Sequence, residues 1–225
     1  MQYAEVLEKL QSLRDPRAVA AMSGYGINAD NAFGISIPRL RKLAKEIGKD
    51  HVLSEQLWSS GIHEARIVAS MIADPQMVTE QELEQWVKDF DSWDVCDQCC
   101  NNFFCKTKLA YQKAMEWSLR REQFVKRAGF VLMACLAVHD KGADDIAFRQ
   151  FLPIIKSQAA DQRNFVKKSV NWALRQIGKR NRTMNAEAID VATDLKRIDS
   201  KSARWIASDA LRELRSNKIQ KRLAN

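Results

Sequence analysis

The sequence lacks the features that would place it in a membrane or in several common enzyme classes. No apolar run reaches the roughly 20 residues that a membrane-spanning helix needs, and the first residues, MQYAE, do not show the basic-then-apolar pattern of a secretory signal. Gly-rich phosphate loops, the His-Glu-x-x-His zinc motif and the Gly-x-Ser-x-Gly nucleophile motif are all missing. We therefore expect a cytoplasmic protein without a membrane partner, whose chemistry, if any, uses another arrangement of residues.

The sequence also offers little for a metal ion. Among five cysteines, Cys96 and Cys99 have a metal-like Cys-x-x-Cys spacing. A structural zinc site takes four ligands, usually as two spaced pairs, and the three histidines supply no second pair. Cys96, Cys99 and Cys100 instead fall in a helical pattern among apolar residues, where cysteine acts as a small apolar side chain. We therefore expect buried thiols in a reducing compartment, and no metal or other cofactor.

What the 225 residues do contain is a succession of helix signals. Asp15 followed by Pro16 marks a helix start, and Thr79 with Glu82 forms a capping box. Between such signals, apolar residues recur every three or four positions, which indicates amphipathic helices, and no set of strands is convincing. The sequence predicts an all-α protein, with helices near residues 37–47, 108–120, 122–139, 144–159, 162–179, 186–196 and 201–216.

Two sequence echoes indicate repeats. FVKR at 124–127 returns as FVKK at 165–168, a shift of 41 residues, and EARIVA at 64–69 has a looser echo in SARWIA at 202–207. A period near ~40 residues with two helices per unit is typical of HEAT-like solenoids, whose stacked pairs form a concave inner surface. We therefore predict a monomeric α-solenoid of stacked HEAT-like helix pairs, as a single domain over residues 1–225 with a basic concave face.

The basic face is predicted from the distribution of charge. Residues 163–225 hold 16 Lys and Arg against 6 Asp and Glu, whereas residues 1–162 hold 20 against 22. Such an asymmetry indicates a polyanionic partner, either nucleic acid or membrane phosphate. A basic surface that only keeps the protein soluble is the alternative.

The FVKR repeat adds a spatial argument for nucleic acid. Lys126, Arg127, Lys167 and Lys168 hold equivalent places in successive repeats, so they would line one face as a basic track. A track suits the regular phosphates of a DNA duplex better than scattered charge does. In the alternative interpretation, some of these side chains pack between helices.

The strongest candidate for chemistry is the segment DSWDVCDQ, residues 91–98. Asp91 or Ser92 would cap a helix on which Trp93 and Asp97 are four residues apart, so that the two share one helical face. A carboxylate on a DNA-binding surface is unfavourable unless a developing positive charge uses it. Taken singly, a helical Trp is more often a core residue, and an Asp more often a cap or a solvated residue.

Three segments in order resemble the AlkD family of HEAT-like-repeat alkylpurine DNA glycosylases: DSWDVCD at 91–97, FVKRA at 124–128 and VNWALR at 170–175. The similarity runs across nearly the whole chain and includes FGISIP at 33–38. The resemblance implies a HEAT-like fold and a DNA repair hydrolase. Such an enzyme hydrolyses the N-glycosidic bond of cationic alkylated purines, of the 3-methyladenine and 7-methylguanine type, in duplex DNA.

The resemblance also assigns roles to single residues. Asp97 matches the family's catalytic aspartate, and Trp93 and Trp172 match two tryptophans that cradle the lesion-bearing nucleotide. Arg127 matches an arginine that contacts the backbone near the lesion. Tyr25 falls at the spacing of an aromatic residue that completes the cradle. Two further residues match contacts to the DNA backbone: Arg175 and Lys179.

The expected chemistry suits these residue types. A purine alkylated at N3 or N7 is cationic, and cleavage of its bond to the sugar moves positive charge onto the deoxyribose. An ionised Asp97 beside that sugar would stabilise the charge and could orient the attacking water. Trp93 and Trp172 would attract a cationic nucleotide by about 1–2 kcal/mol per good contact. Arg127 would hold a phosphate by a charge-assisted hydrogen bond.

Two other functions remain open at this stage. A HEAT-repeat protein could bind distorted DNA with the same cations and aromatic residues but without catalysis. A protein-interaction scaffold is the commonest use of helical repeats, yet it gives no reason for the basic C-terminal region. Steep loss of binding with added salt would favour DNA over a protein partner.

Overall fold

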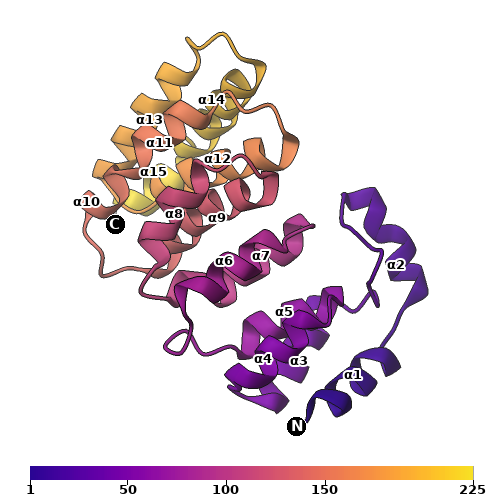
Figure 1. Ribbon diagram of the computed structural model, residues 1–225. Coiled ribbons are helices and arrows are strands. Elements are labelled where there is room, and N and C mark those ends of the chain that lie inside the picture. The colour runs from indigo at the N-terminus through magenta and orange to yellow at the C-terminus, as the bar shows by residue number, and fades with distance from the viewer. Residues whose placement is uncertain (225) are drawn as a thin grey trace. The chain divides into compact units, whose positions relative to one another are not determined.

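The computed structural model describes residues 1–224, which fold into helices joined by loops, with no strand among them (Figure 1). None of the helices described combines the length and the apolar character that a membrane crossing requires. The all-α prediction is confirmed. The chain divides into two compact units, unit 1 from Met1 to Lys108 and unit 2 from Leu109 onward. A single domain over residues 1–225 remains a prediction.

Unit 1 repeats a pair of short helices. Its elements are α1 (Tyr3–Ser12), α2 (Pro16–Met22), η1 (Ser23–Tyr25), α3 (Ile37–Ile47), α4 (His51–Ser59), α5 (His63–Ile72), α6 (Glu80–Lys88), α7 (Trp93–Asn102) and η2 (Phe104–Lys106). Side chains of α4 form hydrogen bonds with side chains of α6 and of its C-cap residue, and a side chain of α5 forms one with a side chain of α7. The partners are 31 residues apart in each case: His51 and Glu82, Trp58 and Asp89, His63 and Asp94. The pair α6–α7 therefore repeats the pair α4–α5.

Unit 2 repeats longer helices. Its elements are α8 (Ala110–Ser118), α9 (Gln123–His139), α10 (Asp145–Arg149), α11 (Phe151–Gln158), α12 (Asn164–Ile177), α13 (Arg182–Leu195), α14 (Lys201–Leu214) and α15 (Asn217–Ala224). The rings of Phe124 and Phe165, at equivalent places in α9 and α12, lie 5.6 Å apart. Asn171 of α12 donates to Asp209 of α14, 38 residues further on. The predicted period near ~40 residues therefore holds in unit 2, whereas unit 1 repeats after 31 residues because its helices are shorter.

Local signals placed most helix starts correctly. The Asp15 carboxylate accepts hydrogen bonds from the Arg17 and Ala18 amides, and Thr79 with Glu82 forms the predicted capping box. Two predicted helices have different bounds. The expected helix at 144–159 is divided at Gln150 into α10 and α11, and the one at 186–196 begins at Arg182.

The core of unit 1 is aromatic and contains the cysteines. The rings of Trp58 and Trp86 stack in parallel with centroids 4.1 Å apart. Cys96, Cys99 and Cys100 on α7 are buried, and burial raises the pKa of Cys99 well above its ordinary value. The cysteines of the described residues are free thiols, and the predicted burial is confirmed for Cys96, Cys99 and Cys100, whereas Cys105 is only partly buried.

The core of unit 2 is built around α9, which is buried along most of its length between α8 and α12. Gly129 permits the close approach of α8, since a Cβ atom at this position would lie 2.3 Å from the backbone nitrogen of Ser118. Lys126 and Arg127, in the first turns of α9, are therefore buried as well.

Candidate functional site

Unit 1 brings Tyr25 and Trp93 together although they are 68 residues apart in sequence. Trp93 is the first residue of α7, and its indole Nε1 donates a hydrogen bond of 3.1 Å to the backbone carbonyl of Tyr25. Tyr25 ends η1 and is 73% exposed. The indole of Trp93 thus lies against the backbone of Tyr25, whose own side chain is exposed; the assignment of both residues to a cradle remains a prediction.

The loop that carries Tyr25 is held at both ends. Asn28 donates to the Asp91 carboxylate at 3.0 Å, next to the start of α7. At the other end the Glu64 carboxylate, which is 1% exposed, accepts three backbone N–H groups. The donors and distances are Phe33 at 2.8 Å, Gly34 at 2.6 Å and Ile35 at 3.1 Å. Glu64 therefore fixes the return of this loop toward α3.

Sequence analysis missed the role of Glu64. It appeared only as the first residue of the echo at 64–69. A glutamate in the first turn of a helix is ordinarily a favourable partner of the helix dipole, so nothing in the sequence indicated that its carboxylate accepts amides from a loop 30 residues earlier. The interaction is non-local, and only the fold reveals it.

Asp94 is engaged in a structural pair. Its carboxylate bonds to His63 Nε2 at 2.8 Å and accepts a hydrogen bond of 2.6 Å from the Ser92 hydroxyl. Burial lowers the pKa of His63, but the hydrogen bond and the charge of Asp94 outweigh it and hold that pKa above its ordinary value. Burial likewise pushes the pKa of Asp94 up, while the bond to His63 brings it below its usual range. This side chain holds α7 against α5.

Ser92, one of two predicted caps of this helix, does occupy the N-cap position of α7. Its side chain does not cap the backbone and bonds to Asp94 instead. Asp97 lies on α7 one turn after Trp93 and, like Trp93, is partly buried, whereas Val95 and Cys96 between them are buried. The predicted common face of Trp93 and Asp97 is therefore confirmed.

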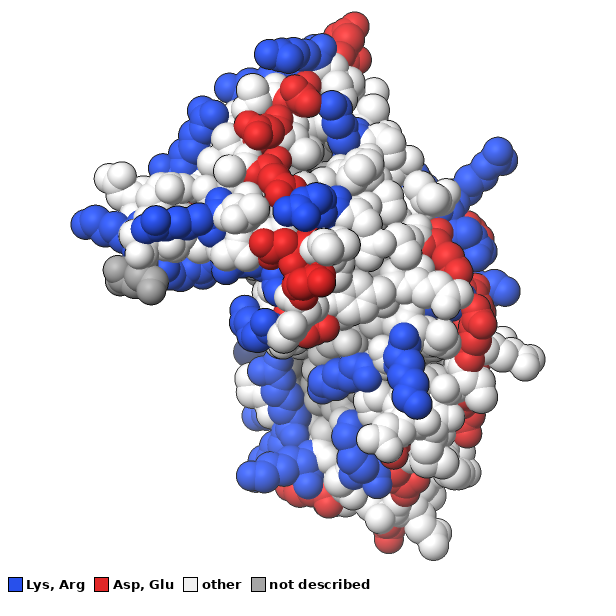
Figure 2. All heavy atoms as spheres, turned by 90° about the vertical axis from the view of Figure 1, so that its left-hand side faces the viewer, with Lys and Arg blue, Asp and Glu red and all other residues white. Residues whose placement is uncertain are grey.

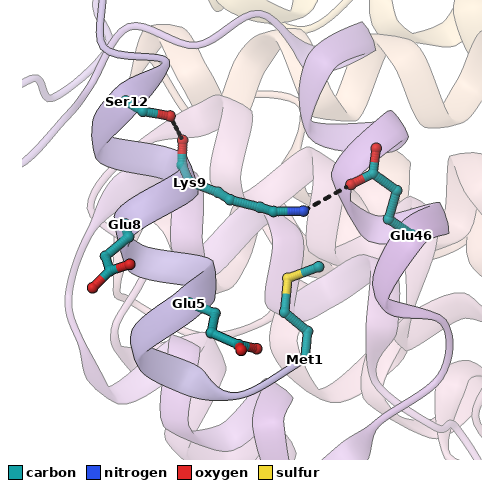
Figure 3. A pocket seen from close by; sticks show the side chains of 6 residues that line it. All are labelled: Met1, Glu5, Glu8, Lys9, Ser12 and Glu46. Carbon is teal, nitrogen blue, oxygen red and sulfur yellow. Dashed lines mark hydrogen bonds and ion pairs between the residues drawn. The ribbon is translucent and has the colours of Figure 1, made fainter.

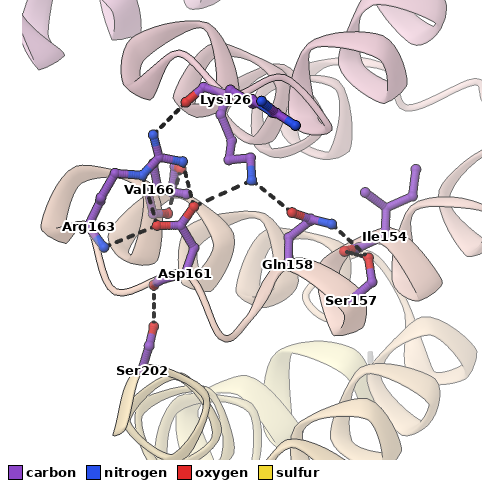
Figure 4. Close-up of polar contacts among 10 residues, drawn as sticks. Lys126, Ile154, Ser157, Gln158, Asp161, Arg163, Val166 and Ser202 are labelled. Carbon is purple, nitrogen blue, oxygen red and sulfur yellow. Dashed lines mark hydrogen bonds and ion pairs between the residues drawn. The ribbon is translucent and has the colours of Figure 1, made fainter. Parts of the chain in front are cut away.

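In unit 2, two of the four cations expected in a basic track are buried. Lys126 is 9% and Arg127 is 6% exposed. The Lys126 amine bonds to Gln158 Oε1 at 2.8 Å and to Asp161 Oδ2 at 3.4 Å, as Figure 4 shows. Arg127 Nη1 donates to the Phe165 carbonyl at 2.7 Å. The prediction of an exposed track is wrong for Lys126 and Arg127, because the segment from α11 to the first turn of α12 covers the start of α9.

The anchor of this buried cluster is Asp161. Burial raises the pKa of Asp161, but hydrogen bonds from Arg163 and the charges of Arg163 and Lys126 lower it below its ordinary value overall. Arg163 Nη2 lies 2.6 Å from the Asp161 carboxylate, and the Ser202 hydroxyl donates to the Asp161 carbonyl at 2.7 Å (Figure 4). Lys126 thus serves to join successive repeats. The phosphate contact assigned to Arg127 by resemblance remains a prediction.

The remaining predicted residues of unit 2 lie on α12, except Lys179, which follows two residues after the end of this helix. Lys168 is exposed, and Trp172, four residues later, is partly buried; a spacing of four places the two on one helical face. Arg175 and Lys179 both bond to the Glu213 carboxylate of α14, Lys179 at 2.6 Å. Burial raises the pKa of Glu213, and these two cations lower it below its usual value. A DNA phosphate would therefore compete with Glu213 for Arg175 and Lys179.

Comparison with known protein families gives one match, which covers residues 6–214 and belongs to the family described as DNA alkylation repair enzyme. The chain belongs to this family. The matched range includes every candidate residue in both units. Comparison with curated proteins gave no match.

A solved structure has the same fold as this DNA alkylation repair family member. It is described as "A new family of proteins related to the HEAT-like repeat DNA glycosylases with affinity for branched DNA structures". The two share 18% sequence identity with a TM-score of 0.82, and the similarity covers 99% of this chain and 96% of that one. The predicted HEAT-like repeat architecture is thereby confirmed.

The charge of this family member is mixed rather than uniformly basic. On the face drawn in Figure 2, acidic side chains run among the basic ones. Part of the positive charge of residues 163–225 is paired within unit 2, for example Lys179 with Glu213 at 2.6 Å and Arg204 with Asp199 at 3.0 Å. The number of Lys and Arg residues in this region therefore overstates how many cations are available to a partner.

Two other polar features lie in unit 1. Of the residues described, His51, Glu55 and Glu82 form a group that could hold a metal ion, on α4 and α6; Cys96 and Cys99 are not part of it. A pocket beside α1 is lined by six residues (Figure 3). They are Met1, Glu5, Glu8, Lys9, Ser12 and Glu46. None of the predicted site residues lines this acidic pocket, which does not suit DNA.

Proposed function

We propose that this protein is a DNA glycosylase that hydrolyses the N-glycosidic bond of cationic alkylated purines, of the 3-methyladenine and 7-methylguanine type, in duplex DNA. The observation that carries the proposal is the arrangement at the start of α7. There the indole of Trp93 is held by the Tyr25 carbonyl, one helical turn before Asp97, in a member of a DNA alkylation repair family.

We assign the chemistry to Asp97 rather than Asp94. Asp94 is committed to His63 and Ser92, and its substitution would loosen α7. Asp97 shares the partly exposed face of Trp93. An ionised carboxylate beside the deoxyribose stabilises the positive charge that develops there when the bond to the base breaks, and it can orient the water that attacks.

Lesion recognition follows from the electron-rich rings. An exposed Tyr25 next to Trp93 offers π faces to a cationic base at little cost in desolvation, and such contacts each contribute about 0.5–2 kcal/mol. A neutral purine gains much less. Trp172, on α12, keeps in this proposal the role that the resemblance assigns to it.

Unit 2 holds the DNA backbone in this proposal. Lys168 is exposed on α12 for a direct phosphate contact, and Arg175 and Lys179 exchange Glu213 for phosphate oxygens. Arg127 is 6% exposed and donates to the Phe165 carbonyl, so its contact with the backbone near the lesion requires the segment that covers the start of α9 to move. The protein acts as a cytoplasmic monomer that needs no cofactor.

The experiment is release of 7-methylguanine from a duplex with a single lesion, without added metal. Wild type releases the base and leaves an abasic site. Asp97→Asn loses about 100-fold or more in rate, the typical size of one electrostatic or acid–base contribution, while its affinity for the duplex changes little. Asp190→Asn makes the same chemical change at an exposed position of α13 and serves as the matched control.

A second candidate function is a non-catalytic DNA-binding protein. The description of the similar solved structure, which names affinity for branched DNA, favours it. Tight, salt-sensitive binding without base release would support this function and overturn the glycosylase. If the protein neither releases the base nor binds the duplex, both DNA functions are overturned and a protein-interaction scaffold is the remaining candidate.

A further inference from the structure

Unit 2 exposes a tryptophan that no assignment so far explains. Trp205, near the start of α14, is 40% exposed. Trp58, Trp86 and Trp117 are all buried, and Trp93 and Trp172 are partly so. Trp205 is therefore the tryptophan of this chain with the most surface open to solvent. Tryptophan is the largest apolar side chain, and at a surface it typically marks a contact with a partner.

A lysine ammonium group lies over the ring of Trp205. Lys167 Nζ lies over it, 4.9 Å from the ring centroid. Lys167 and Trp205 are 38 residues apart, the same separation as Asn171 and Asp209, whose side chains bond at 2.7 Å. The two residues thus occupy equivalent levels of α12 and α14, one helical turn before Asn171 and Asp209.

The acidic residues of α14 do not neutralise Lys167. Asp209 is bonded to Asn171 and Arg212, and Glu213 to Arg175 and Lys179. Within residues 1–224, no ion pair involves Lys167, Lys168 or Lys201. An aromatic ring with the Lys167 ammonium group over it, and with Lys201 one helical turn earlier on α14, suits a polyanion with flat apolar parts, which is the chemistry of a nucleic acid strand.

We propose that Trp205 and Lys167 form a second DNA contact, on the α12–α14 face of unit 2. The Lys167 ammonium binds a backbone phosphate, and the Trp205 ring packs against the sugar and base edge of the same nucleotide. This inference rests on the DNA binding of the proposed function, but not on base excision. It gives Trp205 the task of holding the duplex, separate from lesion recognition by Tyr25 and Trp93.

The test measures how tightly the full-length protein binds a short undamaged duplex. Fluorescence anisotropy gives the affinity at each of a series of salt concentrations. Trp205→Ala lowers the affinity about tenfold, as expected for loss of one aromatic contact with a nucleotide, and Trp205→Phe restores most of it. Lys167→Ala reduces the steepness of the salt dependence by about 0.9, the value for one phosphate.

Two variants of unit 2 serve as controls. Ile146→Ala removes a side chain that is 69% exposed on α10, and Lys156→Ala removes one positive charge from α11, where the amine already pairs with Asp194 at 2.7 Å. Neither variant changes the affinity or the salt dependence as the Trp205 and Lys167 variants do. Thermal unfolding of each variant shows that it is folded.

The outcomes separate this inference from the glycosylase. Affinity of Trp205→Ala equal to wild type overturns the inference, and so does a loss confined to Lys167→Ala, since the ring would then contribute nothing. Loss of affinity in both variants supports it, even if the wild type releases no base and the glycosylase proposal fails. A wild type that does not bind the duplex overturns both.

Discussion

The hydrogen bond from the indole of Trp93 to the backbone carbonyl of Tyr25 ties the start of α7 to a loop that lies 68 residues earlier. The bond fixes the plane of the indole ring, and it leaves the Tyr25 side chain pointing into solvent, 73% exposed. An exposed ring contributes little to folding, and the proposed function gives this ring a task, contact with the lesion.

We therefore expect Tyr25→Ala to impair function without impairing the fold. Excision of 7-methylguanine should fall about three- to tenfold, the equivalent of about 0.7–1.4 kcal/mol of cation–π attraction, while Tyr25→Phe retains most of the activity. The free energy of unfolding should change by less than about 0.5 kcal/mol, as for other exposed positions. Single-turnover kinetics and urea denaturation measure the two effects. Equal activity of Tyr25→Ala and wild type would remove Tyr25 from the cradle.

Glu64 supports this loop from the other side, and its substitution should act on stability. Its buried carboxylate accepts three amides, from Phe33, Gly34 and Ile35. In Glu64→Gln one oxygen becomes an NH₂ group that faces N–H donors, so at least one bond is lost and one repulsive contact is added. We expect a loss of about 2–4 kcal/mol in the free energy of unfolding.

The matched control for Glu64 is Glu46→Gln. Glu46 forms a surface ion pair with Lys9, whose side chain is 49% exposed, and such pairs contribute at most about 1 kcal/mol. Urea denaturation of both variants gives the comparison. A loss in Glu64→Gln no larger than in Glu46→Gln would contradict a structural role for the three bonds.

The His63–Asp94 pair predicts how stability depends on pH. The pKa of His63 is raised in the folded protein, so the folded state holds its proton more tightly than the unfolded state. The stabilisation is fully present below the ordinary histidine value of about 6.5 and is lost as the pH rises through the raised value. The lowered pKa of Asp94 acts in the opposite direction. Its stabilisation is present above the ordinary aspartate value of about 3.9 and is lost as the pH falls through the lowered value.

Comparison of wild type with His63→Gln isolates this dependence. The stability difference between the two should be largest near pH 5–6 and should shrink as the pH rises above about 6.5. Urea denaturation at a series of pH values measures it. A difference that stays constant from acid to alkaline pH would show that the His63 proton does not stabilise the fold.

Sequence alone predicted what is determined locally or by periodicity. The capping box at Thr79 and Glu82 uses residues three apart, and the shared face of Trp93 and Asp97 follows from helical geometry. The FVKR echo identified the repeat of unit 2, because Phe124 and Phe165 do hold equivalent positions. Each of these features depends on a few neighbouring residues or on a single repeat distance.

What the sequence did not reveal depends on contacts between repeats. The repeat of 31 residues in unit 1 was not recognised in the sequence, because the residues at equivalent positions differ in type. His63 and Asp94 are an example. Equivalent positions also differ in burial. Lys126 is covered by the segment that carries Asp161, whereas Lys167, its equivalent in the next repeat, is only partly buried, and Lys168 beside it is exposed. Basic residues at equivalent sequence positions therefore lie at the same level of successive helix pairs, but they need not be equally exposed to a ligand.

This difference in burial predicts opposite effects for two substitutions of the same residue type. Lys126→Ala removes the bonds to Gln158 and Asp161, so it should lower the free energy of unfolding by about 1–3 kcal/mol. Because Arg163 still neutralises Asp161, the loss should remain below the 3–5 kcal/mol typical of a buried charge left alone. The salt dependence of DNA binding should not change.

Lys168→Ala should behave in the reverse manner. Its side chain is exposed on α12, four residues before Trp172, so the free energy of unfolding should change by less than about 0.5 kcal/mol. The slope of log affinity against log salt should become shallower by about 0.9, because one phosphate contact is lost. Urea denaturation and anisotropy titrations of the two variants, side by side, test both expectations. If Lys126→Ala changed the salt slope and Lys168→Ala did not, the DNA would have to reach the covered start of α9, and the segment from α11 to α12 would have to move when DNA binds.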